Sequence, residues 1–262
     1  MKEIYDKPVT DLSLNELEEF ARWYNKNLGN HPVIVGGWAV YSYTKGLGSK
    51  DIDVVFLGSK AMDQTLLAYF SSHNYGERQK GHFGFDSEFV KVVDIGKQKV
   101  DIIIDAVASN RIITFEGKKA RLPWSWAMKH NVEHEIGNAK IYVPIIELLL
   151  AYKLGAVFGR NIELRTGIDI AYYRSKLWKD VYDVVSLTGL EIDARKVEKF
   201  LSESGLGEHK GDIMQTIEDN YDDEARSVLR GASLAKIRKI LTGSGDDTLT
   251  TGSRGAFNPR HR

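Results

Sequence analysis

The segment from residue 33 to residue 57 constrains the fold of this chain more than any other. It opens with the apolar run Val33-Ile-Val35, continues with Gly36-Gly37, and reaches Asp51-Ile-Asp53 after a short helical stretch. A glycine pair after a strand lets the backbone come close to a ligand, because no Cβ intrudes. The N-terminus of the helix that follows favours phosphate. The segment therefore predicts a strand, glycine turn, helix and strand around a ligand site.

Asp51 and Asp53 supply the chemistry of that site. Residues two apart on a strand lie on the same face, so both carboxylates are expected to point the same way. Two carboxylates on one face can hold Mg²⁺ together with substrate phosphates and water. A pair of such ions can activate an attacking oxygen and stabilise a leaving pyrophosphate.

A third carboxylate is expected on the later apolar strand, where Asp101 and Asp105 are both candidates. Four residues apart in a regular strand, they share a face. Asp101 is preferred, because it opens its apolar strand much as Asp51 opens its own. Asp105 lies at the far end, where a turn or solvent would satisfy it.

The first half of the chain mixes helical and strand patterns. Ser13 and Glu16 form a capping-box pattern that predicts a helix start at Ser13. Hairpin-length connections among the later strands favour a mixed sheet. The periodicity predicts helices at 13–28, 38–43 and 60–73, and strands at 32–35, 51–57, 83–94, 97–106 and 111–115.

From Pro144 onward the pattern is helical, and Pro144 suits the first position of a helix. The overall expectation is an α+β fold: a mixed sheet flanked by helices, followed by an all-helical C-terminal domain. We expect a first domain over 1–143, a helical domain over 144–242, and a disordered tail over 243–262, which is rich in Gly, Ser, Thr and Asp. The expected helices are 144–158, 168–176, 178–187, 194–204, 210–221 and 233–241.

The glycine pair and the aspartate pair, separated by thirteen residues, resemble the signature of the DNA polymerase β-like nucleotidyltransferase superfamily. The resemblance implies a minimal mixed sheet flanked by helices, with Asp51 and Asp53 as metal ligands. It also implies Asp101 as the third metal-binding carboxylate and as the base for the incoming hydroxyl.

The helical half is similar to that of minimal and abortive-infection-type nucleotidyltransferases, through Pro144, Glu147, Lys153, Arg160 and the motif Lys179-Asp180-x-x-Asp183. In those proteins the lysine meets nucleotide phosphates, so the resemblance adds Lys153 to Gly36 and Gly37 as nucleotide-binding residues.

Each residue of this helical motif also has a simpler interpretation. Lys153 could reach solvent from a helix surface, and Arg160 could neutralise the C-terminus of its helix. Lys179, Asp180 and Asp183 could be ordinary surface charges.

Three further patterns have structural interpretations that are favoured over functional ones. His130 and His134 have metal-like spacing but no third ligand nearby, so zinc is disfavoured. Trp124 and Trp126 are expected to pack in the interior rather than stack on a base. A basic segment favours a solvated helical face over an RNA-binding surface; its residues are Arg226, Arg230, Lys236, Arg238 and Lys239.

The composition of the chain restricts its expected partners and cellular compartment. The chain has 36 basic and 36 acidic residues, which argues against nucleic acid as the main partner. Cysteine is absent, the N-terminal residues have no signal-peptide core, and no apolar run approaches the length of a membrane span. We therefore expect a cytoplasmic protein with no membrane partner.

The expected activity is transfer of a nucleoside monophosphate from an NTP, ATP first among them, to an acceptor hydroxyl with release of pyrophosphate. The expected cofactor is two Mg²⁺ ions, with Mn²⁺ as a substitute. The acceptor stays open: a small molecule, a protein or an RNA. Two alternatives also stay open, a nucleotide-binding regulatory module with weak or no turnover, and a nucleotidyltransferase that modifies RNA.

Overall fold

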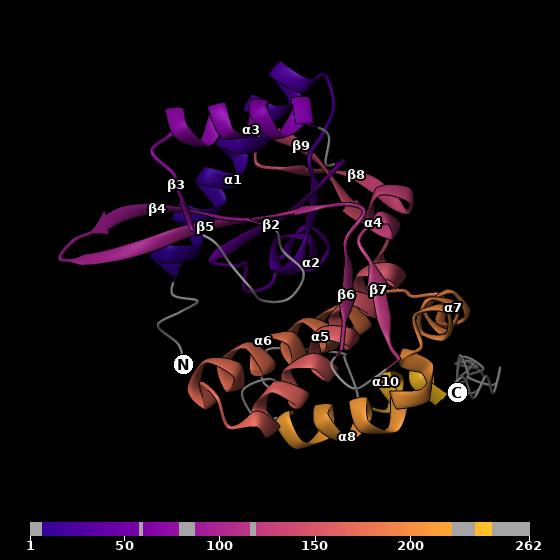
Figure 1. The fold of residues 1–262 in the computed structure, drawn as a ribbon. Helices are drawn as coiled ribbons and strands as arrows, with labels where there is room; N and C mark the ends of the chain where they lie inside the picture. Colours follow the sequence, from indigo (N-terminus) through magenta and orange to yellow (C-terminus); the bar gives the residue numbers. More distant parts are fainter. Residues whose placement is uncertain (1–6, 58–59, 79–86, 116–118, 222–233, 243–262) are drawn as a thin grey trace, which may run out of the picture.

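The chain folds into a mixed sheet followed by a helical half (Figure 1). The computed structural model describes residues 7–57, 60–78, 87–115, 119–221 and 234–242. The expected α+β class, with helices following the sheet, is confirmed. Among the described residues, no helix is both long enough and apolar enough to cross a membrane.

The main sheet has seven strands in the order β3-β4-β5-β2-β1-β9-β8, and β6 pairs with β7 in a separate ribbon. The pairs β2–β5 and β1–β9 are parallel, and the remaining pairs are antiparallel. The strands are β1 (Val33–Val35), β2 (Asp51–Phe56), β3 (Gly76–Arg78), β4 (Ser87–Ile95), β5 (Gln98–Ala108), β6 (Ile112–Thr114), β7 (Arg121–Pro123), β8 (Asn131–Ile136) and β9 (Ala139–Pro144).

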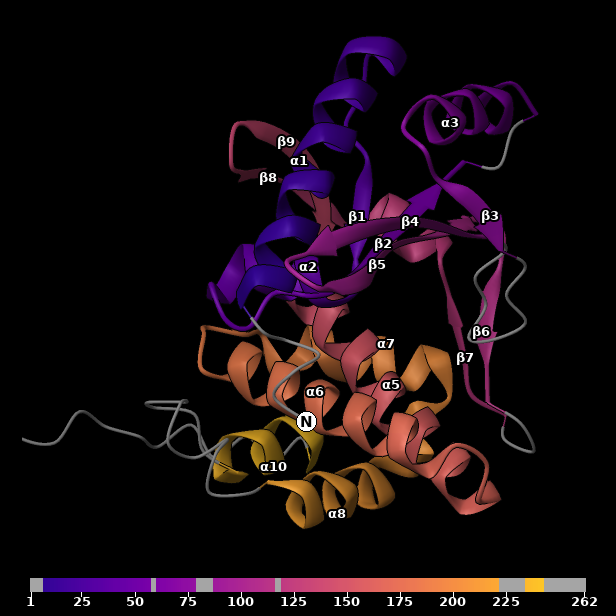
Figure 2. The same cartoon turned by 90° about the vertical axis from the view of Figure 1, so that its left-hand side faces the viewer.

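The helices divide between the two faces of the sheet. Figures 1 and 2 show α1 and α3 over one face, with α2 and the helical half on the other. The helices are α1 (Lys7–Leu28), α2 (Gly36–Thr44), α3 (Lys60–Ser72), α4 (Ser125–Lys129), α5 (Ile146–Thr166), α6 (Ile170–Thr188), α7 (Ala194–Ser204), the 3-10 turn η2 (Leu206–His209), α8 (Lys210–Asn220) and α10 (Leu234–Thr242).

Strand β2 explains why the acidic pair faces the helical half. Ile52 and Val54 are buried, and the alternation of a strand sends them to the face opposite Asp51 and Asp53. The face that carries the two aspartates is the one from which α6 approaches, because Lys176 of α6 contacts Asp51. The acidic pair therefore lies between the sheet and the helices.

The predicted helix start at Ser13 is wrong. Helix α1 already begins at Lys7, and Ser13 lies buried in its second turn. The Ser13 hydroxyl donates to the Lys50 carbonyl over 2.9 Å and accepts from the Trp38 indole over 3.1 Å. Ser13 therefore fixes the loop that enters β2 instead of capping a helix.

Two predictions about the second half also need correction, and one pair of strands was not predicted. Pro144 does not open a helix: it is the last residue of β9, where it pairs with Asn131 of β8. The expected helices 168–176 and 178–187 form the single helix α6, since Leu177 is buried within it and no Gly or Pro interrupts the run. Strands β8 and β9 were not predicted; their pairing brings residue 142 beside Val33 of β1. The tail over 243–262 lies outside the described residues.

Candidate active site

The acidic residues of β2 and β5 meet at adjacent positions of the sheet. Asp53 is the register partner of Asp105 on the parallel strand β5, and Asp51 lies opposite Ile103. Register partners on neighbouring strands share a face, and such strands lie about 4.8 Å apart. Asp105 is 4% exposed. The structure therefore brings Asp51, Asp53 and Asp105 together on one face around the start of β2, and these three residues form an acidic row.

Asp101, the preferred third carboxylate, lies apart from Asp53. The residue opposite Asp51 is Ile103, and Asp101 lies two residues before Ile103 on β5. Its side chain is 41% exposed, and its carboxylate lies 4.0 Å from the Arg78 guanidinium. The parallel register places Asp105, the alternative candidate, beside Asp53 instead.

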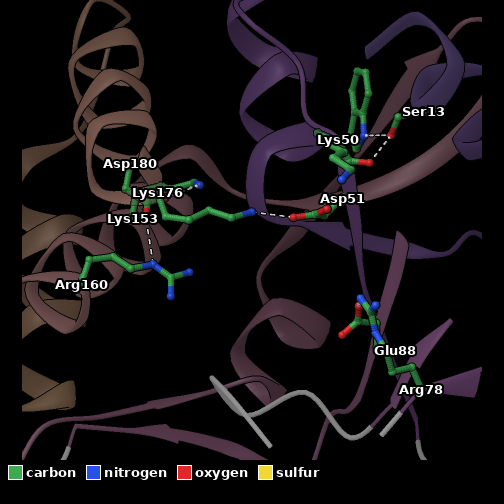
Figure 3. Close-up of polar contacts among 10 residues, drawn as sticks. Ser13, Lys50, Asp51, Arg78, Glu88, Lys153, Arg160, Lys176 and Asp180 are labelled. Atoms are coloured by element: carbon green, nitrogen blue, oxygen red, sulfur yellow. Dashed lines mark hydrogen bonds and ion pairs between the residues drawn. The ribbon is translucent and has the colours of Figure 1, made fainter. Parts of the chain in front are cut away.

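Glu88 extends the acidic row and Arg78 neutralises it, and no sequence pattern singled out either residue. Glu88 of β4 is the register partner of Asp105, and Arg78 of β3 is the partner of Glu88. The Glu88 side chain is 3% exposed and forms an ion pair with Arg78 (Figure 3). The hydrogen bond that Arg78 donates to Glu88 raises the pKa of Arg78. Arg78 thus supplies positive charge to a buried carboxylate next to Asp105, and such a carboxylate is costly without a partner.

The glycine pair is required by the packing around it. Gly36 has φ +65°, and a Cβ there would lie 1.8 Å from Oδ2 of Asp53. A Cβ on Gly37 would lie 2.8 Å from the Ser49 side chain. The group that approaches Gly36 is the Asp53 carboxylate. The predicted approach of a ligand to Gly36-Gly37 stays a prediction.

A pocket lies between the acidic row and the helical half. Gly36 at the start of α2 and Asp53 of β2 line one side of it, and Lys153, Arg160 and Asp180 line it from α5 and α6. The rest of its wall is mainly apolar or aromatic: Val35, Ile113, Phe115, Leu122, Trp124, Leu149, Tyr152 and Ala156. A mainly apolar cleft with a few convergent charges is the usual form of a small-molecule site.

Lys153 is held inside a buried ion-pair network, so the interpretation that it reaches solvent is wrong. Its Nζ lies 3.0 Å from Asp180 and 2.8 Å from Asp183, and its side chain is 9% exposed. Lys179 forms an ion pair with Asp183 and is 6% exposed. Lys179, Asp180 and Asp183 are therefore not surface charges.

The network perturbs its members in opposite directions. Burial alone would lower the pKa of Lys153, but the attraction of Asp183 and Asp180 outweighs it and raises the pKa. Burial lowers the pKa of Lys179, and the attraction of Asp183 offsets this only in part. Burial opposes ionisation of Asp180, yet Lys153 and Arg160 hold the pKa of Asp180 below its usual value.

Arg160 does not cap the end of its helix, because α5 continues to Thr166. Its Nε lies 3.7 Å from Asp180, and its guanidinium lies 5.8 Å from the centre of the Tyr173 ring. The side chain therefore lines the pocket as a cation beside an acid.

Lys176 was also missed, although it joins the two halves directly. Its Nζ lies 2.6 Å from Oδ2 of Asp51, a residue 125 positions earlier in the chain (Figure 3). A helical spacing of four and seven residues sets Lys176, Asp180 and Asp183 on one face of α6.

The side chains of this site fit a divalent cation by chemical type. Carboxylate oxygens are the ligands that Mg²⁺ prefers. The Asp53 carboxylate fills the space that a Cβ on residue 36 would occupy, so Gly36 leaves room for it. Within the described ranges, no three acidic or histidine side chains converge as a ready metal group. Asp51 is instead turned towards Lys176.

The remaining candidates have other contacts. The His130 ring packs 5.4 Å from Phe200, and the His134 ring packs 4.4 Å from Tyr43. Trp124 is buried in the wall of the pocket, as expected of a packing residue.

The basic segment is partly neutralised where it is described. Arg238 pairs with Glu218, and Lys236 donates to the Leu190 carbonyl over 2.5 Å. Arg226 and Arg230 lie outside the described residues.

Comparison with known proteins gives similarity of structure only. No protein-family model and no curated protein matches this chain. An antigenic nucleotidyltransferase-like protein from Paracoccidioides brasiliensis is similar over 80% of this chain and 93% of its own, at 14% identity and a TM-score of 0.45. The antibiotic-resistance factor ANT(2'')-Ia is similar over 76% of this chain and 97% of its own, also at 14% identity and a TM-score of 0.45. Similarity at this level assigns no role to any residue of this chain, so such roles are argued from the geometry of the chain itself.

Proposed function

We propose that this protein is a metal-dependent nucleotidyltransferase that moves a nucleoside monophosphate from an NTP, ATP first among them, to an acceptor hydroxyl. The observation that carries the proposal is the pairing of Asp53 with Asp105 across β2 and β5, with Asp51 on the same face and Gly36 alongside. Adjacent carboxylates at a glycine turn and a helix N-terminus match the needs of a metal–triphosphate substrate.

Asp51, Asp53 and Asp105 would hold the Mg²⁺ ions, and Asp105 takes the role that the sequence alone assigned to Asp101. The bound cations supply charge neutralisation at the triphosphate. The acceptor oxygen forms a bond to the α-phosphorus, the bond from that phosphorus to the bridging oxygen breaks, and pyrophosphate leaves. The acceptor proton would pass to Asp105, which is the register partner of Asp53 and is shielded from bulk water.

Residues of the pocket would bind the rest of the nucleotide. Gly36 and Gly37 begin α2, and Gly36 lines the same pocket as Asp53, an arrangement that suits phosphate. The apolar and aromatic wall is suited to a base. Lys153 would contribute mainly by fixing Asp180 and the pocket wall, because its ion pairs are with two acids of α6.

The test is an assay with each α-labelled NTP, the full-length protein and a cell extract as the source of acceptor. We expect the wild type to transfer label, removal of Mg²⁺ with EDTA to abolish transfer, and Mn²⁺ to restore it in part. Asp53→Asn should lower transfer by about 100-fold or more, because several kcal/mol of charge stabilisation is lost. Unchanged melting of Asp53→Asn would show that the loss is not one of folding.

Binding of ATP by calorimetry, without labelled product from any NTP or extract, would favour a nucleotide-binding regulatory module instead. Equal transfer by the wild type and Asp53→Asn would contradict the assignment of Asp53 as a metal ligand. Label found only in RNA would identify the acceptor class as RNA.

A further inference from the structure

The contact between Lys176 and Asp51 bridges the two halves of the site. Lys176 comes from the helical half and approaches an acid that the proposed reaction needs for its metal ions. The ion pairs of the two neighbouring lysines, Lys153 and Lys179, stay within the helical half, with acids of α6. Lys176 therefore brings a helical cation to the acidic row itself.

The surroundings of Lys176 allow it to change partner. Its side chain is 23% exposed, compared with 9% for Lys153 and 6% for Lys179. The Nζ also lies 5.6 Å from the ring centre of Tyr172, an aromatic residue that is 42% exposed. A lysine is a compact charge on a flexible stem, so it can exchange one anion for another with little rearrangement of its helix.

Electrostatics makes the contact with Asp51 conditional. Asp51, Asp53 and Asp105 gather negative charge on one face of the sheet, and like charges at this separation repel unless a cation lies near. The Lys176 ammonium supplies such a charge. A divalent cation bound to the same carboxylates would make the ammonium redundant at Asp51, while a triphosphate would bring new negative charge to the adjoining pocket.

We propose that Lys176 neutralises Asp51 in the nucleotide-free protein and moves to the triphosphate when a metal–nucleotide complex binds. This inference rests on the proposed function, because it assigns a second state to the same site. Lys176 then competes with the free divalent cation for Asp51 and stabilises the bound nucleotide. Its loss should therefore change the two affinities in opposite directions.

The experiment titrates nucleotide-free, full-length protein with Mn²⁺ and follows free Mn²⁺ by electron paramagnetic resonance. Lys176→Met should bind Mn²⁺ roughly threefold or more tightly than the wild type, because a competing ion pair is gone. Lys176→Arg keeps the charge and should stay close to the wild type. Arg174→Met removes an exposed cation from the same helix and should change nothing.

A second titration uses a non-hydrolysable ATP analogue with Mg²⁺. Lys176→Met should bind it about tenfold more weakly, the loss expected for one charge-assisted hydrogen bond. Equal or weaker Mn²⁺ binding by Lys176→Met would overturn the inference, as would undiminished binding of the analogue.

Asp53→Asn separates this inference from the proposed function. If Asp53→Asn abolishes Mn²⁺ binding while Lys176→Met leaves it unchanged, only the role of Lys176 is lost. If Asp53→Asn binds Mn²⁺ as tightly as the wild type, the proposed metal site itself is refuted. Thermal melting of every variant checks that each remains folded.

Discussion

At the scale of single residues, Gly36 links the backbone of the glycine turn to the acidic row. Its φ of +65° is a conformation that residues with a Cβ adopt at a cost. The second constraint is steric, because the Asp53 carboxylate occupies the space of a Cβ. One glycine therefore serves both the turn and the placement of a proposed metal ligand.

Gly29 provides a matched control for Gly36. Its φ is +63°, and a Cβ added there would meet no described atom within 4 Å beyond its chain neighbours. Gly29→Ala should lower the free energy of unfolding by about 1 kcal/mol, the cost of the backbone conformation. Gly36→Ala should lower it by about 3 kcal/mol, because displacement of Asp53 is added. Chemical denaturation measures both, and equal losses would contradict the steric role of Asp53.

The residue scale also separates local from non-local information. That Asp51 and Asp53 share a face follows from their spacing, and the structure agrees. The choice between Asp101 and Asp105 depends on the register of β5 against β2, which the composition of either strand leaves open. Glu88 and Arg78 depend on two further registers, so only the strand pairing reveals them.

At the scale of elements, α6 carries the charges that connect the helical half to the site. Helical periodicity predicts that Lys176, Asp180 and Asp183 share a face. Their burial could not be predicted in the same way, because it depends on how α5 packs against α6. Uninterrupted helical sequence from Ile170 to Thr188 was the available signal that α6 is one helix.

Removal of Lys153 tests whether the α5–α6 network is structural. Lys153→Met should lower the free energy of unfolding by about 3–5 kcal/mol, because two buried acids lose a partner. The exposed pair Lys199–Glu203, at 3.9 Å, is the control, and Lys199→Met should cost less than about 1 kcal/mol. Similar small losses in both variants would show that the network contributes little to stability.

The same network predicts a dependence of stability on pH. Burial would raise the pKa of Asp180, but Lys153 and Arg160 hold it below its ordinary value of 3.8. A carboxyl group with a depressed pKa stabilises the fold fully above its unfolded pKa and loses that contribution as pH falls towards its folded pKa. The free energy of unfolding should therefore fall as the pH drops from about 5 to about 3.

Asp180→Asn should weaken that dependence, because the substituted side chain does not titrate. Denaturation curves at several pH values measure the slope for each protein. A slope that is identical in wild type and variant would assign the acid sensitivity to other groups.

At the scale of the whole molecule, the pocket exists because sheet and helices meet at the acidic row. Gly36 and Asp53 provide one wall, and Lys153, Arg160 and Asp180 provide the other. The α+β class and most helices could be predicted from the sequence, since those rest on local periodicity. The place of β9 in the sheet could not, because its parallel contact with β1 joins residues that are far apart in the chain, Val33 and Tyr142.

The most direct test of the central claim is the transfer of label from an α-labelled NTP by Asp105→Asn and Asp101→Asn, measured side by side. The two changes are chemically identical and both lie on β5. If Asp53 and Asp105 form the catalytic pair, Asp105→Asn should lose about 100-fold or more of the activity, and Asp101→Asn should stay within about threefold of the wild type. Full activity in Asp105→Asn, with the loss in Asp101→Asn, would contradict the site described above.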